Sequence, residues 1–137
     1  MLSLPGDELN KSVYLARSVI DSVLIYSKGA YPDEAVLLLI GKSNKDGIVV
    51  NGVEVPPLAI LGAGFSNFPI NMLPMDFSIM GTAHSHPSGV LRPSVPDLNN
   101  YYGRLMIITA YPYETESDLA IFDSNGTTLK YSVLEDK

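Results

Sequence analysis

The chain contains an apolar run that ends in two histidines, Phe77-Ser-Ile-Met-Gly-Thr-Ala-His84-Ser-His86. Phe77 to Ala83 is typical of a buried strand, and the Pro-Ser-Gly sequence at 87–89 ends it. Side chains two positions apart on a strand point to the same side of the sheet. We therefore expect the imidazoles of His84 and His86 to project together, about 6–7 Å apart along the strand. That spacing suits two ligands of one metal ion, although a chance pairing of two ordinary histidines is the alternative.

Asp97 is the best candidate for a third ligand. A catalytic zinc site holds the ion with three protein ligands and leaves the fourth position open for water. Asp97 lies in the sequence Ser94-Val-Pro-Asp97, which predicts the start of a helix that continues to about Tyr102. The same residues match a helix-capping pattern, with Ser94 as the N-cap and Asp97 three positions later. The two roles are compatible, since a capping serine can still present a donor toward a metal.

A second carboxylate, Glu34, stands directly before the apolar run Ala-Val-Leu-Leu-Leu-Ile of residues 35–40. Taken on its own, it is a solvated residue at the start of a strand. A hydrolase that uses a metal-activated water also needs a group that carries the proton of the water to the leaving amine, and a glutamate suits this work. Sequence spacing alone does not place Glu34 near the metal.

Composition excludes several classes of protein. The 137 residues carry a net charge of −6, include no cysteine and contain only the two histidines already named. Without cysteine, disulfides, thiolate metal sites and cysteine nucleophiles are excluded. The acidic balance argues against a broad nucleic-acid-binding face, and no apolar run approaches the roughly 18–20 residues that cross a membrane. We expect one cytoplasmic domain over residues 1–137, with residues 1–11 loosely ordered.

Hydrophobic patterning predicts an α/β fold with a mixed sheet and two main helices, one of them short. Strands are expected at residues 13–15, 34–41, 48–55, 77–83 and 105–110, and within 56–70. Helices are expected at residues 16–29 and 94–102. A turn is expected at residues 43–47, a hairpin turn or bulge at Asn51-Gly52, and a hairpin of residues 119–123 and 127–133 around Ser124-Asn-Gly126.

These residues together resemble a known signature. Gly81-Thr-Ala-His84-Ser-His86-Pro87 followed by Ser94-Val-Pro-Asp97 is similar to the JAMM (MPN+) metalloprotease motif of His-x-His, seven residues, Ser, two residues and Asp after a distant glutamate. Tyr31-Pro-Asp-Glu34 resembles the glutamate segment, and Asn71-Met-Leu-Pro74 resembles the small stand-alone archaeal type. The resemblance runs from about residue 12 to the C-terminus. It implies a single MPN domain, cytidine-deaminase-like, with a mixed, mostly antiparallel sheet flanked by a long N-terminal helix and a short helix after the metal motif.

The resemblance also implies a role for each residue. His84, His86 and Asp97 would bind one Zn²⁺ per chain. Glu34 would act as general base on a zinc-activated water and then as acid to the departing amine, and Ser94 would donate a hydrogen bond to the oxyanion. The implied reaction is hydrolysis of the amide or isopeptide bond after the C-terminal Gly-Gly of a ubiquitin-like modifier.

The implied partners are a ubiquitin-like modifier with its conjugates and a proteasome-type complex. We expect neither nucleic acid nor a membrane as a partner, and we expect the protein to be a monomer or a homodimer. A Gly-Gly tail could pair as an extended strand with a sheet edge, and the candidate groove segments are 62–68 and 88–92. Within these segments Phe65 and Arg92 are candidates for substrate binding, with core packing and simple solvation as the alternatives.

Three other functions stay open on the sequence. One is a zinc peptidase that frees a sulfur-carrier protein from its C-terminal adduct, and another is a non-enzymatic scaffold module that keeps zinc for structure only. The third is a RadC-like protein, whose related motif also contains His-Pro-Ser-Gly. The presence of Glu34 and Ser94 argues against the scaffold, since a structural zinc site needs neither residue.

Overall fold

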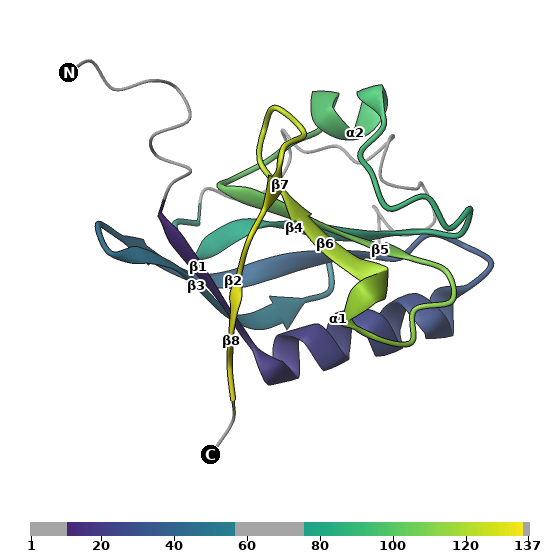
Figure 1. The fold of residues 1–137 in the computed structure, drawn as a ribbon, viewed down its shortest axis with the longest axis horizontal. Helices are drawn as coiled ribbons and strands as arrows, with labels where there is room; N and C mark the ends of the chain where they lie inside the picture. The colour runs from purple at the N-terminus through teal and green to yellow at the C-terminus, as the bar shows by residue number, and fades with distance from the viewer. Residues whose placement is uncertain (1–10, 57–75, 136–137) are drawn as a thin grey trace.

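In the computed structural model, described for residues 11–56 and 76–135, one long helix lies against a face of a curved sheet (Figure 1). The elements in chain order are β1 (Ser12–Ala16), α1 (Arg17–Ala30), β2 (Val36–Asn44), β3 (Gly47–Glu54), β4 (Ile79–His86), α2 (Val95–Asn99), β5 (Leu105–Ala110), the 3₁₀ turn η5 (Glu116–Asp118), β6 (Leu119–Phe122), β7 (Thr128–Leu129) and β8 (Ser132–Leu134). Neither α1 nor α2 is long and apolar enough to cross a membrane.

The described strands form one mixed sheet in the order β7-β6-β5-β4-β2-β3-β1-β8. Four neighbouring pairs are antiparallel and three are parallel, the parallel ones being β1 with β3, β1 with β8 and β4 with β5. This confirms the predicted mixed, mostly antiparallel sheet with one long and one short helix.

The sheet curls until its two edges approach each other. β7 and β8 form opposite edges, yet only residues 130 and 131 separate them in the chain. The Cα atoms of Leu129 and Ser132 are therefore at most about 11 Å apart. Figure 1 shows β7 and β8 as consecutive parts of one yellow trace.

Apolar side chains bury the sheet on both faces. Leu37 and Leu39 of β2 belong to the layer packed against α1, whereas Leu38 belongs to the layer on the opposite face. The first layer is completed by the apolar stripe of α1, namely Val19, Ile20, Val23 and Leu24. The second is partly covered by residues of the segment 91–102, which follows the histidines. Burial on both faces explains why β2 is continuously apolar at its start.

One predicted detail of the β2–β3 hairpin is corrected, and a second is confirmed in one of its two forms. The turn expected at 43–47 is shorter, because residues 43 and 44 still pair with β3. For Asn51-Gly52 the sequence predicts a hairpin turn or a bulge, and the structure confirms the bulge. The register of β2 against β3 shifts between Ile40 and Gly41, which makes Asn51 the extra residue.

Three other boundaries differ from the prediction. α2 ends at Asn99 and does not reach Tyr102. After the helix, Tyr101 and Tyr102 pack on the second apolar layer, and the chain then turns at Gly103, whose φ is 83°. Residues 127–133 are not one strand, since β7 pairs with β6 as expected but β8 crosses to pair with β1. α1 continues through Gly29 to Ala30.

Some predictions lie outside the described residues, which omit 1–10, 57–75 and 136–137. They are most of the N-terminal segment 1–11, the strand expected within 56–70, the groove segment 62–68 with Phe65, and the segment Asn71–Pro74.

Gly81 lies where β4 and β5 approach too closely for any side chain. A Cβ at Gly81 would stand 1.8 Å from the carbonyl oxygen of Leu105, its cross-strand neighbour. We expect Gly81→Ala to lower the free energy of unfolding by roughly 2 kcal/mol or more, because two buried strands must move apart. Gly29→Ala is the matched control, since nothing lies within 4 Å of its Cβ position and alanine favours a helix by about 1 kcal/mol. Urea unfolding measures both, and an equal effect would contradict the close approach.

Candidate metal centre

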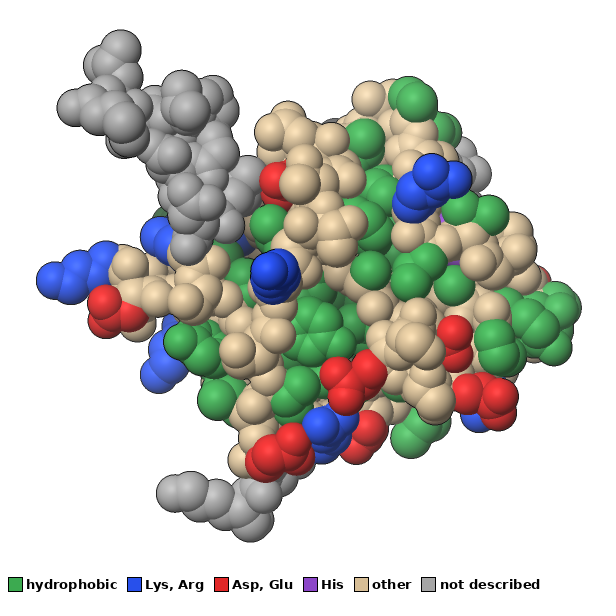
Figure 2. All heavy atoms as spheres, viewed as in Figure 1, with side chains coloured by type: hydrophobic (Ala, Val, Ile, Leu, Met, Phe, Trp, Pro, Cys, Tyr) green, Lys and Arg blue, Asp and Glu red, His purple; other side chains and the backbone are tan. Residues whose placement is uncertain are grey.

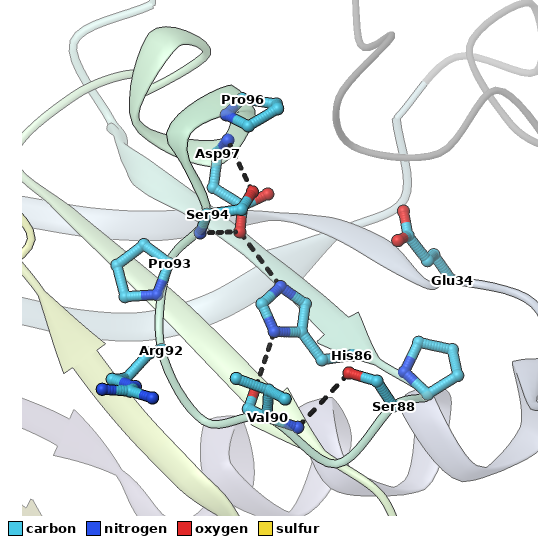
Figure 3. Close-up of a pocket in the computed structure, with 10 residues that line it drawn as sticks. Glu34, His86, Ser88, Val90, Arg92, Pro93, Ser94, Pro96 and Asp97 are labelled. Atoms are coloured by element: carbon cyan, nitrogen blue, oxygen red, sulfur yellow. Dashed lines mark hydrogen bonds and ion pairs between the residues drawn. The ribbon is translucent and has the colours of Figure 1, made fainter.

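One end of β4 borders a cavity of about 670 Å³ at which three parts of the chain meet. β4 contributes His86, the residues before β2 contribute Glu34, and the start of α2 contributes Ser94 and Asp97 (Figure 3). The full set of lining residues is Glu34, His86, Pro87, Ser88, Val90, Arg92, Pro93, Ser94, Pro96 and Asp97. The sheet joins these segments because β2 is the direct neighbour of β4.

The side chains of His84, His86 and Asp97 converge at the wall of this cavity. The two histidine Nε2 atoms are 3.2 Å apart. The carboxylate oxygens of Asp97 lie 3.3 Å from Nε2 of His84 and 3.0 Å from Nε2 of His86. No other group of His, Cys, Asp or Glu side chains within residues 11–56 and 76–135 brings three ligand atoms together in this way.

These distances fit a bound metal ion. Bonds of about 2.0–2.2 Å to nitrogen and oxygen at tetrahedral angles separate neighbouring ligand atoms by about 3.3 Å, which is close to all three distances. Two imidazole nitrogens and one carboxylate also match the three-ligand set of catalytic centres that keep a fourth position for water or substrate. His84 and Asp97 are buried, whereas His86 lines the cavity. The group is therefore accessible from the cavity side.

A backbone carbonyl fixes the orientation of His86. Its Nδ1 donates to the carbonyl oxygen of Val90 at 2.7 Å. Because a carbonyl only accepts, the proton of the neutral ring is on Nδ1, and Nε2 keeps its lone pair for a metal. Burial lowers the pKa of His86, but hydrogen bonds to Asp97 and Val90 outweigh burial and raise this pKa above its usual value. Burial lowers the pKa of His84, which keeps that ring neutral at pH 7.

The start of α2 holds Asp97. Its Oδ2 accepts from the backbone N–H of Ser94 at 2.8 Å, and Oγ of Ser94 accepts from the backbone N–H of Asp97 at 3.2 Å. This reciprocal pair is the predicted capping box. Burial acts to raise the pKa of Asp97, but the hydrogen bonds to His84 and His86 hold it well below its usual range. The carboxylate is therefore ionised and suited to ligate a cation.

Glu34 lies across the cavity from Asp97 (Figure 3). It precedes β2 by two residues, and Val36 at the start of β2 stands opposite His84. Two-residue spacing on antiparallel strands brings Glu34 level with His86. The charge of Glu34 acts on both histidines in the direction that raises their pKa values. The sheet register thus brings Glu34 into the cavity that His86 and Asp97 share, which sequence spacing alone could not place.

Ser85, which lies between the two histidines, makes a contact that the sequence pattern does not predict. Its Oγ accepts from the backbone N–H of Ala35 at 2.7 Å, and its own N–H donates to the carbonyl oxygen of Ala35 at 3.1 Å. Ala35 directly follows Glu34, so Ser85 ties the backbone of the carboxylate to the strand that carries both histidines. A buried serine within a strand pattern gives no signal for this contact, which depends on the pairing of β2 with β4.

Arg92 lines the same cavity, on the opposite side of His86 from Glu34 (Figure 3). Its contact with a substrate stays a prediction. Phe65, the other candidate for substrate binding, lies outside the described residues.

Comparisons with known proteins agree with one another. A family model described as prokaryotic homologs of the JAB domain matches residues 16–121. A probable metalloprotease of Haloferax volcanii is 34% identical over 130 residues, which cover 90% of this chain and 80% of that protein. Among solved structures, a JAB1/MPN domain protein from Archaeoglobus fulgidus has a TM-score of 0.67 and 29% identity, covering 90% of this chain and 98% of that one. The structure described as "JAMM: A Metalloprotease-like Zinc Site in the Proteasome and Signalosome" has a TM-score of 0.65 and 29% identity, covering 91% of this chain and 100% of that one.

The convergence of three ligand atoms predicts a bound metal ion that depends on each side chain. Protein purified without chelator should retain close to one metal ion per chain, and His84→Ala or Asp97→Asn should weaken metal affinity by about 100-fold or more. Elemental analysis and competition with a chelator measure this. Arg92→Gln is the matched control, since it changes a polar residue of the same cavity outside the group and should keep the metal. Unchanged metal content in His84→Ala would rule out the assignment.

Proposed function

This chain belongs to the prokaryotic JAB domain family, and on that premise we propose that it is a zinc-dependent metallopeptidase that hydrolyses the bond after the C-terminal Gly-Gly of ubiquitin-like modifiers. The observation that carries the proposal is the convergence of His84, His86 and Asp97 beside a cavity that Glu34 shares. The probable metalloprotease among the relatives, and the metalloprotease-like zinc site named for a similar structure, support the hydrolase class. The modifier and the isopeptide linkage rest on the resemblance of the motif to JAMM isopeptidases.

Zinc held by His84, His86 and Asp97 would supply Lewis acidity, which lowers the pKa of a water molecule and polarises the scissile carbonyl. The chain itself holds the ligands in position. The carbonyl of Val90 orients His86, and the backbone N–H of Ser94 orients Asp97. Such outer contacts are as much a part of a metal site as the ligands, because they fix ring tautomer and carboxylate direction.

Glu34 transfers the proton. Its carboxylate accepts a proton from the attacking water as the new C–O bond forms, and it gives that proton to the amide nitrogen as the C–N bond breaks. The products are a carboxylate on the modifier and a free amine on the target. The exposed position of Glu34 at the cavity makes it accessible to both the water and the departing amine.

Ser94 acts on the carbonyl side of the same bond. Its Oγ accepts the N–H of Asp97, so the hydrogen of the hydroxyl is available to donate to the oxygen that becomes negatively charged. The capping box holds this hydroxyl before substrate binds, and a preorganised donor costs no reorganisation during the reaction.

The preferred substrate follows from size and charge. A tail that ends in Gly-Gly has no side chains near its terminus and so can approach a site set at the wall of a cavity. The net charge of −6 favours a neutral or basic modifier over an acidic one.

Glu34→Gln tests the assignment of the base. The wild-type protein should cleave a Gly-Gly-ended modifier linked to the ε-amine of a lysine, and a zinc chelator should abolish the cleavage. Glu34→Gln should retain zinc and lose about 10²- to 10⁴-fold in kcat, because the amide cannot accept the proton. Mass spectrometry of the products and elemental analysis measure both quantities. Loss of zinc together with activity would refute the base, and tight zinc binding without any cleavage by the wild type would favour the scaffold alternative.

Ser85→Ala tests whether the hold on Ala35 positions Glu34. Removing the hydroxyl leaves the Ala35 N–H without its acceptor, and a displacement of Glu34 of the order of 1 Å should lower kcat by about 10- to 100-fold. KM and zinc content should stay unchanged. Ser85→Thr keeps an acceptor at the same position and should restore most of kcat. A merely structural serine would instead show a loss of stability with no selective effect on kcat, and no rescue by threonine.

A further inference from the structure

Two tyrosines from distant parts of the chain form an exposed aromatic pair. The ring centroids of Tyr31 and Tyr111 are 4.5 Å apart with an interplanar angle of 30°, and the two residues are 45% and 49% exposed. The ring of Tyr113, which is only 1% exposed, packs edge-on against both, at 6.4 Å from Tyr31 and 5.9 Å from Tyr111. Tyrosines on a rigid base are common at the energetically dominant positions of binding surfaces.

Tyr113 has a backbone conformation that a bulky residue rarely adopts. Its φ is 61°, and its N–H donates to the carbonyl oxygen of Ala110 at 3.0 Å in a tight turn. A glycine would take this conformation without strain. Strained residues persist where their surroundings hold them, and they concentrate at functional sites. Here the strained turn places under the exposed pair a ring that a glycine would lack.

The aromatic pair adjoins the candidate metal centre. The backbone N–H of Tyr111 donates to the carbonyl oxygen of His86 at 3.2 Å, and Tyr31 precedes Glu34 by three residues. In Figure 1 the connection from α1 to β2 and the loops after β4 and β5 meet at one end of the molecule. Figure 2 shows hydrophobic side chains gathered at that end with acidic side chains beside them. The chain therefore brings the pair close to His86 and Glu34, two of the residues that line the cavity.

The roles proposed for Ser94 and Glu34 give the scissile bond a direction across this surface. Ser94 acts on the carbonyl oxygen and Glu34 on the amide nitrogen, and the two lie on opposite sides of His86 (Figure 3). The departing amine and the chain attached to it therefore lie on the side of Glu34. Among the residues that line the cavity, Glu34 is the one nearest in the chain to Tyr31.

We propose that Tyr31 and Tyr111 bind the target-protein segment that carries the modified lysine, an inference that rests on the proposed isopeptidase function. The aliphatic stem of a lysine packs well on an aromatic face, and cationic neighbours are attracted to the face of the ring. Asp33 and Glu114 are exposed and lie close to the pair in the chain. The carboxylate of Glu114 is 3.9 Å from Nζ of Lys28, with which it forms an ion pair. This charge balance fits a segment with lysine or arginine next to the modified lysine and disfavours an acidic segment.

A binding measurement tests the proposal without turnover. The probe is a fluorescent peptide whose central lysine carries Gly-Gly on its ε-amine and is flanked by arginines, and the protein is the full chain with Glu34→Gln to prevent cleavage. Adding Tyr31→Ala or Tyr111→Ala should weaken binding about 5- to 10-fold in fluorescence anisotropy, whereas Tyr31→Phe and Tyr111→Phe should bind nearly as well as the parent. Phe77→Ala is the matched control, because Phe77 is 89% exposed but precedes β4 at its opposite end, and β4 runs about 17 Å from Ile79 to His84. A glutamate-flanked peptide should bind more weakly to the parent.

A kinetic comparison separates this proposal from the proposed function. The same modifier is supplied in two forms, one joined through its C-terminal carboxyl to the lysine of a peptide and the other joined through that carboxyl to ethylamine, which lacks the target segment. Tyr111→Ala should raise KM for the conjugate about 5- to 10-fold and leave the ethylamide unaffected. The proposal would be overturned if Tyr111→Ala affected both substrates equally, or if the Tyr111→Ala and Phe77→Ala proteins bound the peptide equally well. It would also be overturned if the probe showed no detectable binding, or if the substitutions changed the oligomeric state and left the affinity for the peptide unchanged. Failure of the wild type to cleave either substrate in a chelator-sensitive way would instead overturn the proposed function.

Discussion

The pairing of β2 with β4 is the constraint on which the rest of the site depends. Val36 stands opposite His84, and Ser85 binds both backbone groups of Ala35. Because alternate residues of a strand face opposite sides of the sheet, a slip of one residue would turn the histidines into the layer packed against α1 and remove Glu34 from the cavity. One register thus sets two metal-ligand candidates and the proposed base at the same time.

Asp97 reaches the site by a different route, and its carboxylate serves two purposes. Oδ2 accepts the N–H of Ser94 and so stabilises the first turn of α2, while Oδ1 lies 3.3 Å from Nε2 of His84. A helix as short as α2, Val95–Asn99, has little stability of its own. Its geometry therefore depends on the cap, so the integrity of the helix start and the position of the third candidate ligand are coupled.

Local signals predicted a good deal of this molecule. The two-residue period of strands placed His84 and His86 on one side, and the capping pattern placed Ser94 and Asp97 in a helix start, because both rules act within a few residues. The bulge at Asn51, the crossing of β8 to β1 and the contact of Ser85 with Ala35 depend on pairings between distant segments, which no local pattern encodes. The stacking of Tyr31 on Tyr111 belongs to the same class, since it arises only when two loops reach one end of the sheet.

The short terminal strands have a consequence for how the protein meets other chains. In the described part of the sheet, the edges are β7 with two residues and β8 with three. Such short edges offer few unpaired backbone groups to an incoming strand and so protect against edge-to-edge aggregation. Both edges are formed by the last strands of the chain, and only residues 130 and 131 separate them. Recognition on this part of the surface then falls to side chains and loops more than to backbone pairing.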